Sequence, residues 1–206
     1  MMSEDQIHWQ GVYTTKSPDA VSWFQPLPEP SCKMMDMLGV EPPARVVDIG
    51  GGASGLVDVL IERGFEVTVL DIAEAALAAV RKRLGAAASK ADWQIGDIRQ
   101  WRPIGRYDLW HDRAVFHFLT SAEDRALYLS ALNAGVAPGG AVILATFAED
   151  GPEQCSGLPV RRYGADQLTS ELGPGFTLVH HSRETHRTPW GSEQSFTWVG
   201  LRRVSS

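Results

Sequence analysis

The stretch ARVVDIGGGASG, residues 44–55, decides how the rest of the chain is interpreted. A short run rich in β-branched residues ends at three consecutive glycines, which is typical of a buried parallel strand followed by a tight loop. Gly50, Gly52 and Gly55 fit the spacing G-x-G-x-x-G, and Asp71 follows Gly50 by 21 residues. Glycines let the backbone approach a ligand closely, and the start of the next helix offers free N–H groups. By spacing alone, the loop predicts a dinucleotide site.

Strand and helix signals alternate after this loop. Further strands are predicted at 65–71, 91–97, 107–112 and 141–147, and helices at 54–63, 73–84, 121–136 and about 164–172. This alternation implies an α/β fold with a parallel sheet, in which ligands bind at the carboxyl ends of the strands. Two last strand-like stretches, 176–187 and 193–204, predict a terminal antiparallel hairpin.

Composition narrows the class of protein. The chain has 206 residues, of which 44% are hydrophobic, and this is enough for one domain with a full core. A net charge of −6 gives no electrostatic case for nucleic acid or for an anionic membrane. The sequence has no signal-peptide pattern and no apolar run of ~18 residues, and its two cysteines are far apart. We therefore expect a single cytoplasmic domain, spanning residues 1–206, without a nucleic-acid or membrane partner.

Asp48 decides which cofactor the glycine loop favours. It stands at the end of the first strand, two residues before Gly50, and should face the ligand crevice. A carboxylate there would repel the pyrophosphate of a nicotinamide cofactor. It would attract the ammonium and sulfonium groups of S-adenosylmethionine, SAM. The position of Asp48 therefore favours SAM.

Two further acids follow the next strands. Asp71 is placed for the ribose hydroxyls, and Asp97 for the adenine amino group, with Ile72 and Ile98 as apolar neighbours of the ring. Each acid has a structural alternative, because Asp71 could cap the following helix and Asp97 could cap a turn. Acids at the ends of several strands together favour the SAM interpretation. The predicted cofactor-binding residues are Asp48, Gly50, Gly51, Gly52, Asp71, Ile72, Asp97 and Ile98.

Four motifs within about residues 40–150 resemble the class I SAM-dependent methyltransferases. They are VVDIGGGASGL (46–56), VTVLDIAEAAL (67–77), IGDI (95–98) and PGG (138–140). The resemblance implies a Rossmann-like, seven-stranded sheet of order 3-2-1-4-5-7-6, with strand seven antiparallel and helices on both faces. Within the single domain we expect an N-terminal lid segment (1–30), a SAM-binding core (31–147) and a substrate-side region (148–206).

The stretch WHDRAVFHFL, residues 110–119, follows the fourth strand, where the methyl group of SAM should point. Methyl transfer needs an aligned acceptor, excluded water and a proton acceptor if the nucleophile is protonated. Asp112 or His111 could take that proton, and Arg113 could hold an anionic acceptor or favour a thiolate. Structurally, Arg113 could instead pair with Asp112, and His111 could pack under the strand. The predicted catalytic residues are Asp112, Arg113 and His111.

The order of several later residues is similar to that of the thiopurine S-methyltransferase-like group. The matching positions are Asp112-Arg113-Ala114, Asp124-Arg125, Tyr128, Gly151-Pro152 and Pro159-Val160. The resemblance implies a small thiol or related chalcogen as acceptor, beneath an aromatic N-terminal lid. This chain departs from the group at Ala114, where glycine is usual, and in the inserted residues 153–158. The predicted acceptor-side residues are Tyr13, Trp23, Phe24, Phe116 and Phe147.

A second resemblance leaves the acceptor open. Elongation-factor lysine methyltransferases share the glycine motif and an aromatic arrangement like Trp9, Tyr13 and Trp23-Phe24. A protein-lysine methyltransferase is therefore the main alternative; a nicotinamide-dependent oxidoreductase and a non-catalytic SAM-binding module are more remote ones. Adjacent His180 and His181 would point to opposite faces of a strand, so no metal site is predicted.

Overall fold

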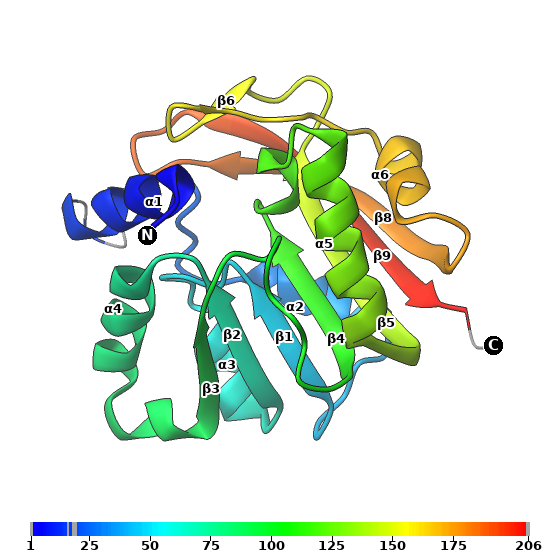
Figure 1. Ribbon diagram of the computed structural model, residues 1–206, viewed down its shortest axis with the longest axis horizontal. Coiled ribbons are helices and arrows are strands. Elements are labelled where there is room, and N and C mark those ends of the chain that lie inside the picture. Colours follow the sequence, from blue (N-terminus) through cyan, green and yellow to red (C-terminus); the bar gives the residue numbers. More distant parts are fainter. Residues whose placement is uncertain (1, 16, 18–19, 205–206) are drawn as a thin grey trace.

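Strand β4 (Tyr107–Arg113) lies in the middle of a seven-stranded sheet in the computed structural model, which describes residues 2–15, 17 and 20–204 (Figure 1). The strand order is β3-β2-β1-β4-β5-β9-β8. The other strands are β1 (Arg45–Ile49), β2 (Glu66–Asp71), β3 (Ala91–Ile95), β5 (Val136–Phe147), β8 (Phe176–Arg187) and β9 (Glu193–Arg203). With β9 antiparallel to both of its neighbours, the predicted order and the antiparallel strand are confirmed.

Helices cover both faces of the sheet. On one face, α2 (Glu29–Met37), α3 (Leu56–Arg63) and α4 (Glu74–Leu84) contribute to a core that includes Leu60 and Leu109. On the other face, α5 (Ala122–Gly135) and α6 (Ala165–Leu172) enclose a second core around Trp110. A seven-stranded sheet with both faces covered is the Rossmann-like arrangement expected for class I methyltransferases.

The helix ends follow from local sequence. Gly64 ends α3 in the left-handed conformation, with φ at +88°, where a residue with a side chain would be strained. The Ser121 hydroxyl caps α5 by accepting a hydrogen bond from the Asp124 backbone N–H at 3.0 Å. These signals explain why the two predicted helices agree with the observed ones to within about two residues.

Three features differ from the expected organisation. The PGG motif (138–140), which precedes the predicted fifth strand, lies inside β5, because Val136 already pairs with Tyr107 across a bulge. The N-terminal lid (1–30) contains a helix of twelve residues, α1 (Glu4–Thr15). The loop after β5 contains a small hairpin, β6 (Gln154–Cys155) and β7 (Leu158–Pro159). None of the helices in the described part of the chain combines the length and apolar character needed to cross a membrane.

Candidate active site

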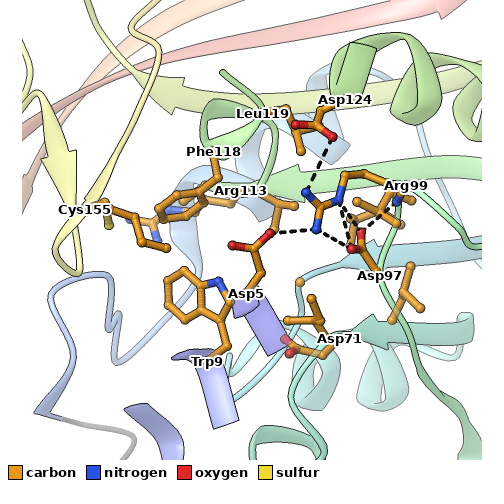
Figure 2. Close-up of a pocket in the computed structure, with 18 of the residues that line it drawn as sticks. Asp5, Trp9, Asp71, Asp97, Arg99, Arg113, Phe118, Leu119, Asp124 and Cys155 are labelled. Atoms are coloured by element: carbon orange, nitrogen blue, oxygen red, sulfur yellow. Dashed lines mark hydrogen bonds and ion pairs between the residues drawn. The ribbon is translucent and has the colours of Figure 1, made fainter. Parts of the chain in front are cut away.

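A cavity of about 310 Å³ opens at the carboxyl ends of β1, β2 and β4 (Figure 2). The strand ends and the loop after β3 supply one end of it, here called the cofactor end, which is lined by Gly50, Asp71, Ile72, Asp97 and Ile98. The other end, here called the acceptor end, is lined by Trp9, Trp23, Arg113, Phe118, Cys155, Leu158 and Pro159. The parallel strands therefore bring residues from three separate loops to one site, as the topology predicts.

The glycine loop approaches this site without room for side chains. Gly50 has φ at +66°, and an added Cβ would lie 2.1 Å from Cγ2 of Val115. At Gly51 a Cβ would lie 2.6 Å from Oδ2 of Asp48, and at Gly52 it would lie 2.8 Å from Oδ2 of Asp71. The three predicted glycines thus keep the space next to two carboxylates open.

Asp71 is buried at the end of β2 and lines the cavity. Its Oδ1 accepts a hydrogen bond from the Ala73 backbone N–H at 2.8 Å, as a helix-capping residue would. Burial raises the pKa of this carboxyl to about 7, and the nearby charge of Asp48 adds to the rise. A buried carboxylate with its charge facing a cavity is suited to accept hydrogen bonds from hydroxyl groups of a ligand.

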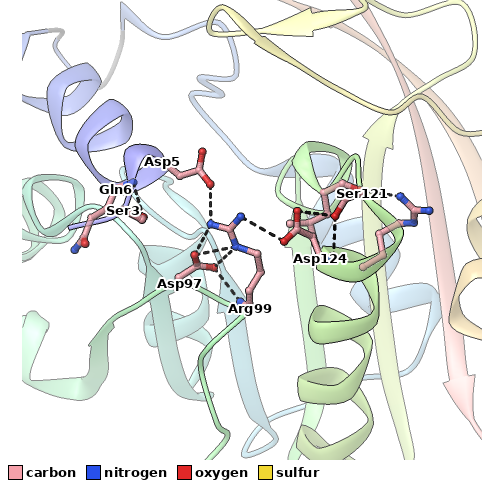
Figure 3. A network of polar contacts seen from close by, with 9 residues as sticks. Ser3, Asp5, Gln6, Asp97, Arg99, Ser121 and Asp124 are labelled. Carbon is pink, nitrogen blue, oxygen red and sulfur yellow. Dashed lines mark hydrogen bonds and ion pairs between the residues drawn. The ribbon is translucent and has the colours of Figure 1, made fainter. Parts of the chain in front are cut away.

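Asp97 belongs to a polar network at the rim of the cavity (Figure 3). The Arg99 Nε donates to both of its carboxylate oxygens at 2.9 Å. The same guanidinium donates to Asp5 of α1 at 2.7 Å and lies 3.5 Å from Asp124 of α5. Arg99 therefore ties the N-terminal helix to the loop after β3, a role that the sequence analysis did not assign.

Asp48 and His111 line a second, smaller cavity of about 50 Å³ next to the glycine loop. Asp48 is only 2% exposed, and its Oδ1 lies 2.7 Å from Nδ1 of His111. Its Oδ2 has no hydrogen-bond partner within the described residues. A buried carboxylate oxygen left without a donor indicates that a ligand donor completes the site.

Asp112 does not face the acceptor, contrary to its predicted catalytic role. It is fully buried and lines neither cavity. Its carboxylate accepts hydrogen bonds from the backbone N–H groups of Val115 and Phe116 and, at 2.6 Å, from the Tyr128 hydroxyl. Side chains alternate along a strand, so Asp112 points to the α5 face while its two neighbours point to the other. Burial raises the pKa of Asp112 to about 6, and its partners hold the turn in place.

Arg113 lines both cavities. Its Nη1 donates to the Trp23 backbone carbonyl at 3.0 Å, and its guanidinium lies 4.7 Å from the centre of the Phe196 ring. Glu184 approaches it at 3.8 Å, while Nε and Nη2 make no hydrogen bond to any described residue. A cation nine-tenths buried with two unused donors can hold an anionic group.

Some of the aromatic residues predicted on the acceptor side line a cavity, and the others lie in the hydrophobic cores. Tyr13 and Trp23 line both cavities, and Phe24 lines the smaller one. Phe116 and Phe147, also predicted on the acceptor side, are fully buried in the cores and line neither cavity.

Trp9 and Phe118 instead complete the acceptor end, with their ring centres 5.1 Å apart. Phe118 lies in the short helical turn η3 (Phe116–Phe118), directly after the buried His117. Sequence spacing alone did not show which of these residues faces the cavity. Burial lowers the pKa of His117 to about 3, so its ring is neutral.

The small hairpin closes the acceptor end from the other side. Cys155 lies in the cavity wall and is 4% exposed, as expected for a buried loop cysteine. Burial raises the pKa of its thiol to about 11, so the side chain is neutral. Leu158 and Pro159 add apolar surface beside it. These hairpin residues were not among the predicted site residues.

Comparison with known proteins places this geometry in a class. Residues 46–140 match a family model described as a methyltransferase domain. No curated protein sequence matches the chain. Solved structures share its fold at low sequence identity, as follows.

One was solved in work on the conversion of a disulfide bond into a thioacetal group during echinomycin biosynthesis; it is 20% identical with a TM-score of 0.77, over 97% of this chain and 93% of that one. Another is the 1,6-didemethyltoxoflavin-N1-methyltransferase of Burkholderia thailandensis, 20% identical with a TM-score of 0.71, over 98% and 84% of the two chains. A third is the glycopeptide N-methyltransferase MtfA, 16% identical with a TM-score of 0.63, over 85% and 87%.

Residues 46–140 are therefore a methyltransferase domain within a class I fold, and SAM is the cofactor of such a domain. The residues present fit this cofactor. Asp48 keeps a buried carboxylate oxygen without a partner, and the glycine loop leaves no room for side chains beside Asp48 and Asp71. The predicted enzyme class and cofactor are thereby confirmed.

Proposed function

We propose that the protein transfers the methyl group of SAM to a small thiol or related chalcogen bound at the acceptor end of the cavity. The observation that carries this proposal is the buried Arg113 guanidinium, whose Nε and Nη2 make no hydrogen bond to a described residue, with Glu184 3.8 Å from Nη2.

The cofactor would be held at the cofactor end, where it supplies an electrophilic methyl group. Asp48 would bind the ammonium group, Asp71 the ribose hydroxyls, and Asp97 with Ile72 and Ile98 the adenine ring. The Gly50–Gly52 backbone would lie against the amino-acid half. Ile98 is 6% exposed and Asp97 lines the same cavity, which supports a half-apolar adenine pocket.

The enclosure of the acceptor end favours a small molecule. Trp9 of helix α1 and Cys155 of the β6–β7 hairpin both lie in its wall (Figure 2), and Trp23 adds a third segment. A protein-lysine methyltransferase needs an open groove that admits a polypeptide segment. The structurally similar 1,6-didemethyltoxoflavin-N1-methyltransferase acts on a small molecule, which also supports a small acceptor here.

The chemistry of the walls favours an acceptor that arrives already deprotonated. The cavity is also lined by Asp5 and Asp124, but both carboxylates pair with Arg99, at 2.7 and 3.5 Å, so no described residue at the acceptor end offers an unpaired carboxylate or an imidazole. Cys155 is a neutral thiol, and the nearby Asp112 carboxylate is turned to the other face of the sheet. A thiol with a pKa of about 8.5 supplies enough thiolate at neutral pH, whereas an amine or alcohol would need a base.

Arg113 would stabilise that thiolate. Burial in an apolar environment strengthens its attraction for an anion, and a nearby cation lowers the pKa of a thiol. Sulfur also packs favourably against aromatic rings, which Trp9, Trp23 and Phe118 provide. The enzyme would accelerate transfer by aligning the thiolate with the methyl group and by excluding water.

The test is to identify the labelled product. The purified enzyme is incubated with methyl-labelled SAM and three sets of acceptors: aryl and alkyl thiols with selenite, the matching alcohols and amines, and a cell-lysate protein fraction. We expect label in thiols and none in their oxygen analogues. Label confined to protein would favour the lysine alternative, and label on amines alone would overturn the thiol assignment.

A further inference from the structure

Three buried side chains from three separate elements form one hydrogen-bonded chain beside the glycine loop. His111 of β4 lies at the centre, with its Nδ1 2.7 Å from Asp48 Oδ1 and its Nε2 2.9 Å from the Ser31 hydroxyl. Ser31, Asp48 and His111 are 1%, 2% and 3% exposed. Burying these polar groups costs desolvation free energy, which their hydrogen bonds must offset, so a fully buried polar chain calls for a functional explanation.

The sheet register explains why these groups meet. Asp48 and His111 are paired residues of the parallel strands β1 and β4, so their side chains point to the same face. Helix α2 packs on that face and presents Ser31 from its first turn. A neutral imidazole with its proton on Nδ1 donates to Asp48 and accepts from the Ser31 hydroxyl, so both ring nitrogens are used.

The order serine, histidine and aspartate is that of a hydrolytic triad, yet the surroundings exclude that activity. Ser31 is only 1% exposed, and its hydroxyl is hydrogen-bonded to His111, so it is not presented to a substrate carbonyl. The free end of the chain is instead Asp48 Oδ2, which has no partner in the described structure. It points toward the glycine loop, because a Cβ at Gly51 would lie 2.6 Å from it.

We propose that His111 and Ser31 are positioning residues, which aim this free carboxylate oxygen at the ammonium group of the cofactor. The inference rests on the proposed placement of the cofactor. The hydrogen bond from Nδ1 fixes the rotation of the carboxylate, and the Ser31 hydroxyl fixes the ring that provides this bond. Since His111 donates a hydrogen bond without removing the charge, the carboxylate keeps its attraction for a cation.

Two ligands separate this role from a general structural one. S-Adenosylhomocysteine carries the amino-acid half of the cofactor with its ammonium group, and 5′-methylthioadenosine lacks that half but retains the adenosine. Positioning of Asp48 should therefore matter for the first ligand and leave the second unaffected. Both affinities are measured by calorimetry on the full chain, which reads binding rather than turnover.

Four variants give a graded series. His111→Leu removes both hydrogen bonds, and we expect the affinity for S-adenosylhomocysteine to fall on the order of tenfold. His111→Asn retains a donor for Asp48 and should recover most of the loss, whereas Ser31→Ala should cost about threefold. Ser170→Ala, at an exposed site on α6, is the matched serine control and should change neither affinity.

The outcomes distinguish the positioning role of His111 and Ser31 from the proposed placement of the cofactor. Selective loss of S-adenosylhomocysteine affinity, with methylthioadenosine within about twofold of wild type, supports the positioning role. Equal loss of both ligands, or no loss of either, overturns it. If the wild-type protein binds methylthioadenosine but not S-adenosylhomocysteine, the cofactor placement itself fails. If His111→Leu does not fold, Ser31→Ala decides by the same criterion.

Discussion

The two ends of the cavity are built in different ways. The cofactor end is formed by residues at the carboxyl ends of consecutive parallel strands, including Gly50 and Asp71, and Asp48 lines the smaller cavity beside it. Its geometry follows from the sheet. The acceptor end combines α1, the segment around Trp23 and the β6–β7 hairpin, which are far apart in sequence and converge only in three dimensions (Figure 1). Cofactor contacts should therefore be rigid and individually large, and acceptor contacts should be distributed over several elements.

Loss of the Asp71 carboxylate is the largest effect that we expect. Asp71→Ala should reduce S-adenosylhomocysteine affinity by at least about 100-fold, because two hydrogen bonds to a buried charged acceptor would be lost. Calorimetry measures the change, and Asp92→Ala, on the exposed end of β3, serves as the control. Unchanged affinity in Asp71→Ala would show that the cofactor lies elsewhere.

Replacement of Arg113 should affect turnover of the acceptor much more than binding of the cofactor. Replacement by leucine should lower kcat/KM for a thiol acceptor by roughly 30-fold, equivalent to about 2 kcal/mol, because a charge-assisted contact is lost. The affinity for S-adenosylhomocysteine should change less than about threefold, since Asp48 and Asp71 remain. If both quantities fall together, Arg113 serves the cofactor, and the assignment of this residue to the acceptor is wrong.

The raised pKa of Asp71 predicts a pH dependence of cofactor binding. With a pKa of about 7, the carboxyl is mostly protonated at pH 6 and mostly ionised at pH 8. Only the ionised group accepts from both ribose hydroxyls, so the affinity for S-adenosylhomocysteine should rise about tenfold over this interval. Asp71→Asn should bind weakly with no such slope. A slope that persists in the variant would belong to another group.

The same pKa has the opposite effect on stability. A carboxyl whose folded-state pKa lies above its unfolded value of about 3.9 contributes stability that is complete below that value. This contribution is lost as the pH rises to about 7. Thermal unfolding of the cofactor-free protein should therefore show a loss of stability between pH 4 and pH 7 that Asp71→Asn reduces.

The smallest effect concerns the attachment of α1. Asp5→Ala removes a partly exposed contact to Arg99 at 2.7 Å, so it should raise the KM for the acceptor by about threefold or less. The difference from wild type should shrink as ionic strength increases, because salt screens the pair. A large loss of cofactor affinity in this variant would contradict the division of the cavity into two ends.

The sequence predicted the cofactor end well for a physical reason. Strand ends and glycine loops have local signatures, and the parallel topology then brings Asp48, Asp71 and Asp97 to one edge. The glycine spacing predicted where the backbone must come close, and the structure has no room for a Cβ at Gly50 or Gly51.

The acceptor end was harder because it depends on side-chain direction and on long-range packing. His111, Asp112 and Arg113 were grouped as one catalytic turn, although β4 continues through Arg113 and turns Asp112 to the other face. Period-two alternation along that strand was the available signal. Phe116 and Phe118 in η3 likewise differ in direction, so only Phe118 reaches the cavity. No local pattern could have placed Cys155 in the same cavity wall as Trp9.

The central claim is that the described residues lining the acceptor end include no unpaired base, and one measurement tests it most directly. Methyl transfer is measured as kcat/KM against pH for a series of aryl thiols that differ in acidity. If the thiolate is the reacting form and the enzyme supplies no base, the midpoint of each profile should follow the pKa of the free thiol. A midpoint that stays constant across the series would show that an enzyme group takes the proton, and would contradict this account.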